Sequence, residues 1–289
     1  MELELGLSQT MLAAIGGIFG LLLGSFLNVV ILRLPTRMYG EWRREARHYL
    51  NLEAEPQTQV INLSKPASYC PACGTSIKPQ HNIPLLSYLF LQGRCNACGV
   101  SISIQYPLIE LLSGLLTSFF IYRYGLSITS LYCIIFSYSL VVLAAIDLHE
   151  KLLPDEITLP LLWLGLFANL NHQFVTLNSA VLGAIAGYLS LWLVFWIFKI
   201  FTGKEGMGYG DFKLLAALGA WMGWQILPMV IFLSTAVSAL IGIGSIVFAG
   251  RNKNAPMAFG PYLAMAGWIA FVWGDTILTN YLGLFDLRY

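Results

Sequence analysis

The chain has 289 residues, of which 57% are hydrophobic and only 11% are charged, and its mean hydropathy is +0.69. Soluble domains carry about 25% charged residues, so this composition excludes a soluble globular protein and predicts a polytopic membrane protein that contacts a lipid bilayer. The formal net charge of +1 gives no indication of a nucleic-acid partner, and we expect none. The first eight residues include Glu2 and Glu4 but no lysine or arginine, so we expect the first apolar run to be retained rather than removed as a signal peptide.

The first predicted helix covers residues 11–32. Gly16, Gly20 and Gly24 recur along it and predict a face of small residues suited to close helix packing. Asn28 is polar within the run, and we expect it to form an interhelical hydrogen bond.

Seven further apolar runs follow, which makes an all-α fold with about eight transmembrane helices. The runs at residues 157–170 and 214–225 are short, and about 10–14 apolar residues barely span a bilayer, so full crossings and shallow or re-entrant segments both stay open for them. The seven runs cover residues 107–122, 128–146, 157–170, 177–200, 214–225, 231–249 and 259–278.

A polar segment at residues 33–106 separates the first run from the second. We therefore expect three parts, namely a first transmembrane helix at residues 1–32, an inserted polar domain at residues 33–106 and a membrane domain at residues 107–289. Within the polar segment, residues 42–49 fit either a basic amphipathic helix on the membrane surface or an ordinary solvated helix.

The basic residues predict the orientation in the membrane. If the runs alternate in direction, all but two of the 16 lysines and arginines fall on one side, and the exceptions are Arg123 and Arg288. The basic side is expected to be cytoplasmic, with both termini on the other side. The inserted domain, Asp147 and Asp211 then lie at the cytoplasmic face.

Four of the five cysteines form two C-x-x-C pairs within the inserted domain. Both pairs belong to one repeated motif, C-x-A-C-G-x-S-I, at residues 70–77 and 95–102. Four thiolates at this spacing predict a closed, structural zinc site with no open position for chemistry. Two disulfides or a redox pair are the alternative, which a reducing compartment disfavours. The predicted ligands are Cys70, Cys73, Cys95 and Cys98.

Two aspartates lie at the edges of apolar runs. Asp147 ends the run at residues 128–146, and Asp211 follows alternating glycines shortly before the run at residues 214–225. A carboxylate beside a hydrocarbon layer is costly, which makes it a functional candidate. Hydrolysis by two carboxylates needs one ionised group to activate water and one protonated group to polarise the carbonyl, a division that nearby like charges enforce. The alternative is a flexible loop in which Asp211 only caps a helix.

Three polar neighbours of these aspartates receive simpler interpretations. Asp155 follows a proline and precedes a helix, so we expect an N-cap role rather than catalysis. Lys213 either biases the charge of Asp211 or marks the membrane boundary. His149 has no other histidine at a clear ligand spacing, which gives a catalytic metal little support.

Together these motifs resemble the bifunctional type IV prepilin peptidases, also called prepilin leader peptidase/N-methyltransferases. The resemblance covers nearly the whole chain, from about Gly24 to Pro261, and the combination of motifs is highly specific. The G-x-G-D motif alone would be weak, because presenilin-like proteases share it. The matching segments are residues 24–35, the two C-x-x-C pairs with residues 81–84 between them, residues 106–110, residues 147–155, residues 208–213 and residues 259–261.

This resemblance implies that Asp147 and Asp211 are the catalytic residues of a transmembrane aspartic peptidase domain. The four cysteines would bind structural Zn²⁺ in a domain linked to N-methylation. The implied substrates are type IV prepilin or pseudopilin precursors of pilus or type II secretion systems. Their short basic leader would be removed at the cytoplasmic face of the bacterial inner membrane, and the new N-terminus would be methylated with S-adenosylmethionine. No local signature identifies the methyl-donor pocket; Glu110 and Asn82 are its polar candidates, and neither is assigned.

Two other functions compete with this one. The first is a G-x-G-D membrane protease for another signal-type substrate, without methyltransferase activity, in which the zinc domain is only a scaffold. The second is a membrane transporter or assembly scaffold, since intramembrane carboxylates often carry protons or ions. Transporters typically repeat broken helices in two halves, whereas here the acidic residues cluster at one face and the halves share no motif.

Overall fold

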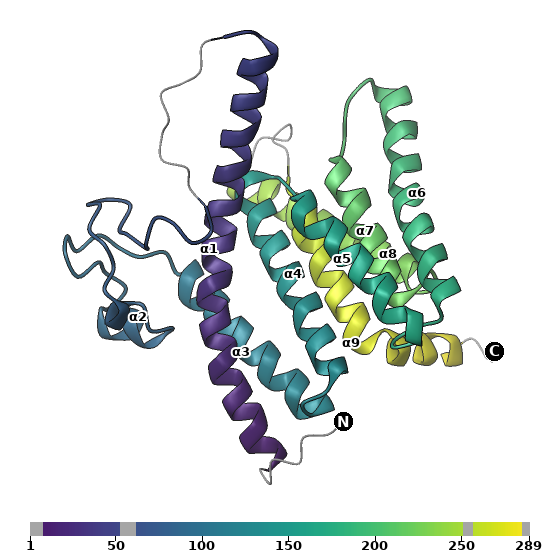
Figure 1. Cartoon of the computed structure of the whole chain (residues 1–289). Helices are drawn as coiled ribbons and strands as arrows, with labels where there is room; N and C mark the ends of the chain where they lie inside the picture. The colour runs from purple at the N-terminus through teal and green to yellow at the C-terminus, as the bar shows by residue number, and fades with distance from the viewer. Residues whose placement is uncertain (1–7, 53–61, 251–256, 285–289) are drawn as a thin grey trace. The chain divides into compact units, whose positions relative to one another are not determined.

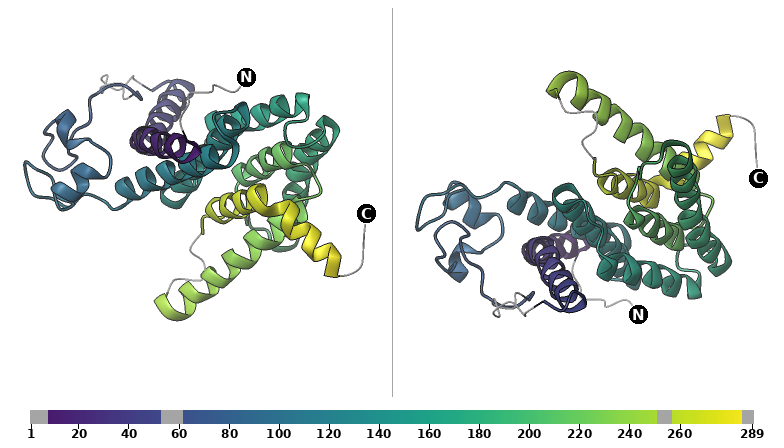
Figure 2. Two further views of the ribbon diagram at one scale, coloured as in Figure 1. Left: turned by 90° about the horizontal axis from the view of Figure 1, so that it is seen from below. Right: turned by 90° about the horizontal axis from the view of Figure 1, so that it is seen from above.

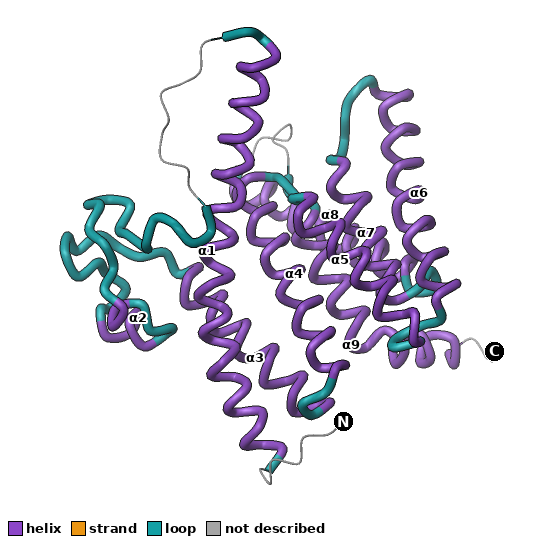
Figure 3. The backbone as a smooth tube through the Cα atoms, viewed as in Figure 1, coloured by secondary structure: helices purple, strands orange, loops and turns teal. Residues whose placement is uncertain are grey.

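The computed structural model describes residues 8–52, 62–250 and 257–284. These residues are helical, with no β-strand beyond two isolated bridges, which confirms the all-α prediction (Figure 3). Eight helices in this part of the chain correspond to the eight predicted runs. They are α1 (Gln9–Tyr49), α3 (Gln105–Tyr124), α4 (Ile128–Glu150), α5 (Asp155–Ala168), α6 (Leu177–Thr202), α7 (Tyr209–Met222), α8 (Leu227–Ala249) and α9 (Gly260–Leu284).

Four of these helices are long and apolar enough to cross a membrane: α1, α4, α6 and the part of α8 at Leu227–Phe248. The chain is therefore a helical protein of membrane type, whereas a crossing by all eight helices stays a prediction. Of the basic residues used to predict orientation, Arg251, Lys253 and Arg288 lie outside the described residues.

The chain divides into two compact units, residues 1–138 and residues 139–289, and α4 contributes to both. In the first unit, α1 packs closely against α3 along its glycines. A Cβ added at Gly20 would lie 2.8 Å from the carbonyl oxygen of Ser113, and one at Gly24 would lie 2.7 Å from the Cα of Glu110. The predicted small-residue face is therefore confirmed. The interhelical bond expected of Asn28 is present as well, because its Nδ2 donates to the carbonyl oxygen of Tyr106 over 3.1 Å.

Helix α1 extends well beyond the predicted end at residue 32. Ser8 caps its N-terminus by accepting a hydrogen bond from the backbone of Met11, and the helix then continues through Pro35 to Tyr49. A proline removes one backbone hydrogen bond but does not by itself end a helix whose following residues favour helix. The predicted span at residues 11–32 is thus the first part of a longer helix, because the apolar run and the helix end at different places. Residues 42–49 are its last turns.

The rest of the polar segment is mostly loop. Residues 62–104 contain only a short 3₁₀ helix, η1 (Pro79–His81), and one helical turn, α2 (Leu86–Phe90). Figure 2 shows these loops beside α1 and α3 of the same unit. So little regular structure leaves few apolar contacts to hold the segment together, which is the usual situation of small domains that depend on a metal.

Helix α7 is the core of the second unit. Phe212, Leu215, Leu218 and Trp221 have no measurable exposure, and α5 and α6 lie alongside α7 (Figure 1). The Trp221 indole donates to the carbonyl oxygen of Leu161 over 2.8 Å, which ties α7 to α5. Helices that are apolar on all sides lie in the core of a protein, and α7 is one of them. Its predicted apolar run was short, but the helix is nevertheless buried.

The contact between α6 and α7 yields a stability prediction. A Cβ at Gly183 would lie 2.3 Å from the backbone oxygen of Gly219, whereas one at Gly244 in α8 would meet nothing within 4 Å. Gly183→Ala should therefore lower the free energy of unfolding by about 1–3 kcal/mol, the usual cost of overpacking a core. Gly244→Ala is the matched control, because it changes helix propensity equally without a clash. Thermal unfolding in detergent measures both, and equal melting temperatures would contradict the prediction.

Candidate active site and candidate metal centre

The two predicted aspartates lie in the same unit, and both are buried. Asp147 is in the last turn of α4 with 5% of its surface exposed, and Asp211 is in the first turn of α7 with 7% exposed. The charge of Asp147 acts on Asp211, so the structure brings together two carboxyl groups that lie far apart in the sequence.

Asp211 is held by the start of its own helix. Gly208 is the N-cap of α7, and its backbone N–H hydrogen-bonds the Asp211 carboxylate. Asp211 is thus the third helical residue, the position from which an acidic side chain reaches back to the N-cap in a capping box. The alternative in which Asp211 is only the N-cap is wrong, because Gly208 occupies that position. Its carboxylate supports the cap and also experiences the charge of Asp147.

Asp147 is held by a residue distant in the chain. The backbone N–H of Gly260, the first residue of α9, donates to its Oδ2 over 2.9 Å. A Cβ at Gly260 would lie only 2.7 Å from that oxygen, so no other residue allows this approach without a shift. Residues 259–261 form one of the motifs recognised in the sequence, but the sequence alone predicts no role for Gly260. A Gly-Pro pair at a helix start was the available signal.

Leu153 packs against the glycine that precedes Asp211 and the glycine that bonds Asp147. A Cβ at Gly210 would come within 2.7 Å of the Leu153 Cβ, and one at Gly260 within 3.1 Å of its Cδ2. Leu153 is itself buried. Gly210, the last of the alternating glycines before Asp211, therefore lets the backbone approach this side chain closely.

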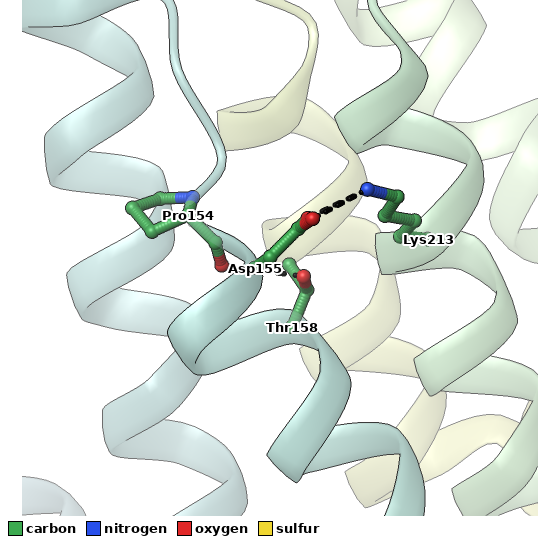
Figure 4. A network of polar contacts seen from close by, with 4 residues as sticks. All are labelled: Pro154, Asp155, Thr158 and Lys213. Atoms are coloured by element: carbon green, nitrogen blue, oxygen red, sulfur yellow. Dashed lines mark hydrogen bonds and ion pairs between the residues drawn. The ribbon is translucent and has the colours of Figure 1, made fainter. Parts of the chain in front are cut away.

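Asp155 does not cap its helix as predicted. Pro154 occupies the N-cap of α5, and Asp155 is the first helical residue. Its carboxylate instead accepts two hydrogen bonds of 2.7 Å from Lys213, as Figure 4 shows. Thr158 in the same figure donates to the Pro154 carbonyl oxygen over 3.2 Å. Lys213 is therefore paired with Asp155.

No metal group forms around the aspartates within the described residues. The His149 Nδ1 lies 2.8 Å from the carbonyl oxygen of Ala145 in its own helix. The only described cluster of three or more potential metal ligands is that of the four cysteines.

The four cysteines come together as predicted. Their sulfur atoms all lie within 4.8 Å of one another, and the distance between the Cys70 and Cys98 sulfurs is 3.9 Å. Tetrahedral zinc with Zn–S bonds of about 2.3 Å requires sulfurs about 3.8 Å apart, so the residues present fit that ion. All of them are free thiols, which excludes the alternative of two disulfides in this structure. Cys133 is buried in α4 and is not part of this cluster.

The two halves of the cysteine cluster have the same backbone geometry. The N–H of Cys70 donates to the carbonyl oxygen of Thr75, and the N–H of Cys95 donates to that of Val100. The glycine after each second cysteine has a positive φ, +69° at position 74 and +72° at position 99, a conformation that side chains rarely adopt. The sequence repeat is thus a structural repeat of two C-x-x-C turns.

The thiols of the cluster differ in acidity. Hydrogen bonds from the side chain and backbone of Thr75 lower the pKa of the Cys73 thiol to about 6. The backbone N–H of Cys98 similarly lowers the pKa of Cys95. The Val100 N–H also acts to lower the pKa of Cys98, but partial desolvation and the neighbouring cysteines outweigh it and raise that pKa to about 11. Four sulfurs at this distance ionise together only if a cation compensates their charge.

Known proteins match both units of the chain. Residues 18–124 match the bacterial peptidase A24 N-terminal domain, and residues 134–243 match the type IV leader peptidase family. No solved structure gives a significant match.

Relatives named prepilin leader peptidase/N-methyltransferase align with most of the chain. The Pseudomonas aeruginosa protein is 51% identical over 265 residues, which cover 92% of this chain and 91% of the relative. The Aeromonas hydrophila protein is 52% identical over 270 residues, covering 92% of this chain and 93% of the relative. The Neisseria gonorrhoeae protein is 48% identical over 264 residues, covering 91% of both.

The ion pair beside the aspartates yields a second prediction. Its side chains remain in contact with water, with 29% of Lys213 and 51% of Asp155 exposed. A double-mutant cycle with Asp155→Asn and Lys213→Met should therefore give a coupling free energy of about 0.2–1 kcal/mol, as exposed pairs do. Denaturation in detergent measures it, and the similarly exposed pair Lys199–Glu205 provides the matched cycle. A coupling energy several times larger for the first pair alone would contradict this.

Proposed function

The chain belongs to the type IV leader peptidase family, and we propose on this basis that it is a membrane aspartic endopeptidase and N-methyltransferase. Its substrates are type IV prepilins or pseudopilins, whose short basic leader it removes. It then methylates the new N-terminal residue with S-adenosylmethionine. The observation that carries the peptidase assignment is the buried pair Asp147 and Asp211, held together in one unit. The shared name of the relatives favours this function over a protease without methyltransferase activity and over a transporter.

In the proposed cleavage, the two aspartates divide the work of hydrolysis. One carboxylate accepts a proton from water as the water attacks the peptide carbonyl, and the protonated partner donates a hydrogen bond to the carbonyl oxygen. The pair titrates as a unit, so the roles belong to the dyad rather than to either residue. The backbone donors at Gly208 and Gly260 fix both carboxyl groups before the substrate arrives. Such preorganisation avoids the cost of orienting the groups during the reaction.

We place the protein in the bacterial inner membrane, with eight crossings and with the dyad at the cytoplasmic face. Support comes from the distribution of basic residues, because an excess of lysine and arginine is expected on the cytoplasmic side. The dyad lies at the ends of α4 and α7 rather than at their centres. A leader that carries positive charge can reach a site at helix ends without entering the hydrocarbon layer.

The four cysteines are proposed to hold a structural Zn²⁺ ion. The ion would replace the missing apolar core of residues 62–104 and compensate the charge of the thiolates, while all four of its positions are filled by sulfur. Its contribution is therefore to fold the segment and not to act on the substrate.

The dyad predicts a selective loss of cleavage. Asp147→Asn and Asp211→Asn should each lower the rate of leader removal by roughly 10²–10⁴-fold, the usual contribution of a positioned acid or base. A purified prepilin in detergent serves as the substrate, and methyl transfer to a pre-cleaved peptide is scored separately and should persist. Asp155→Asn, a nearby carboxylate in an exposed pair, is the control and should cleave normally. Normal cleavage by either dyad variant would refute the assignment.

The cysteine cluster predicts zinc content. The purified chain should carry one zinc ion, measured by mass spectrometry of the metal, and Cys73→Ser or Cys98→Ser should lose it. Acidification should also release the zinc, because protons compete with the metal for the thiolates. Cys133→Ala is the control, since that buried cysteine is not part of the cluster. Full zinc occupancy in both serine variants would contradict the proposed site.

A further inference from the structure

A buried cluster of polar groups lies in the first unit. We use the name polar pocket for the side chains of Ser25, Asn28 and Glu110 with the backbone of Leu85 and Tyr106. Ser25 and Asn28 are one turn apart on α1, and Tyr106 and Glu110 are one turn apart on α3. Leu85 belongs to the loop before α2, so three segments of the unit meet here.

Asn28 has an unpaired oxygen in this pocket. Its side chain is only 2% exposed, and its Nδ2 donates to the carbonyl oxygens of Gly24 and Tyr106. Both partners are acceptors, which fixes the orientation of the amide and leaves Oδ1 on its other side. That oxygen is buried and has no hydrogen-bond partner within the described part of the chain. An acceptor in this state is costly to bury unless a donor reaches it.

The other buried asparagine of the described residues behaves differently. Asn169 is fully buried, its Nδ2 donates to the carbonyl oxygens of Ala220 and Trp221, and its Oδ1 accepts the backbone N–H groups of Phe174 and Val175. This chain can therefore satisfy a buried amide completely. The unpaired oxygen of Asn28 is a local feature of the polar pocket.

Glu110 supplies a carboxylate to the same pocket. It is 8% exposed and accepts the backbone N–H of Leu85 over 2.8 Å, while the Ser25 side chain also hydrogen-bonds it. Leu85 has a φ of +57°, which is uncommon for a residue other than glycine. Two donors do not fill a carboxylate that can accept about four hydrogen bonds. No lysine or arginine forms an ion pair with Glu110 among the described residues.

We propose that the polar pocket binds a primary amino group of a reactant of methyl transfer. An ammonium group offers three N–H donors and a positive charge, which matches the unpaired Asn28 oxygen and the incompletely paired Glu110 carboxylate. The inference rests on the proposed function, whose reaction involves two such groups. One is the new α-amino group of the cleaved peptide, and the other is the amino group of S-adenosylmethionine. Of the two polar candidates named from the sequence, Glu110 lies in this pocket, whereas Asn82 is exposed.

The test compares Glu110→Gln with wild type in the full-length, zinc-loaded protein. Glutamine keeps an acceptor for the Leu85 N–H but removes the charge. We expect methyl transfer to a pre-cleaved peptide to lose roughly tenfold to a hundredfold in kcat/KM, as when a hydrogen bond to a charged group is lost. Leader cleavage and zinc content should stay at wild-type values. Glu45→Gln, an exposed glutamate on the same helix as Ser25, is the matched control.

Calorimetry then distinguishes the two sources of the amino group. S-Adenosylhomocysteine carries the amino group of the methyl donor, whereas methylthioadenosine lacks it. If the pocket binds the donor, Glu110→Gln weakens S-adenosylhomocysteine and leaves methylthioadenosine unchanged. If it binds the peptide, both nucleosides bind normally and the loss appears in the KM for the peptide.

A second variant keeps the proposal testable if Glu110→Gln does not fold. Asn28→Ser removes the unpaired oxygen, while the serine hydroxyl can still bond the carbonyl oxygen of Gly24. It should show the same selective loss. Wild-type methyl transfer in a variant that cleaves normally would overturn the inference. A wild-type protein that neither cleaves nor methylates would instead overturn the proposed function.

Discussion

A carboxyl group that leaves water must find hydrogen-bond donors elsewhere, and this requirement explains the arrangement of the polar residues in the chain. Three carboxyl side chains are buried within the described residues: Glu110, Asp147 and Asp211. Each of them is bonded to a backbone N–H, from Leu85, Gly260 and Gly208 respectively. Backbone donors are fixed by the fold, whereas a lysine or arginine partner would bring a second buried charge with its own desolvation cost. The chain keeps its cations at exposed pairs such as Lys213 with Asp155.

Close backbone approach is the second condition, and glycine meets it. Gly260 lets α9 begin against Asp147, and Gly24 lets α3 pass α1 at Glu110. The contact of Gly183 with Gly219 places α7, which carries Asp211, deep among the helices of its unit. Rigid helices without intervening side chains hold a carboxyl group more firmly than a surface loop does. The same packing that stabilises the unit therefore fixes the position of its reactive groups.

Much of this structure could be predicted from the sequence because its signals are local. The apolar runs predicted the eight helices, and the repeated cysteine motif predicted the two similar cysteine turns, since both patterns depend on neighbouring residues. The sequence was less informative where one local signal, such as a proline or an aspartate near a helix end, allowed two outcomes. Helix α1 continues past Pro35, and Pro154 rather than Asp155 occupies the N-cap of α5. The partners of the buried carboxyl groups could not be predicted, because Gly260 lies 113 positions from Asp147 and only the fold brings them together.

The two proposed reactions have to occur in order on one end of a peptide, since the amine that is methylated does not exist until the leader has been cut. They also make opposite demands on water. Cleavage consumes a water molecule, whereas water must not compete with the amine during methyl transfer. The candidate groups for the two reactions belong to different units, with Asp147 and Asp211 in residues 139–289 and Glu110 and Asn28 in residues 1–138. Each carboxyl group takes its backbone donor from its own unit. Each unit therefore supplies the hydrogen bonds that hold the carboxyl groups proposed for its own reaction.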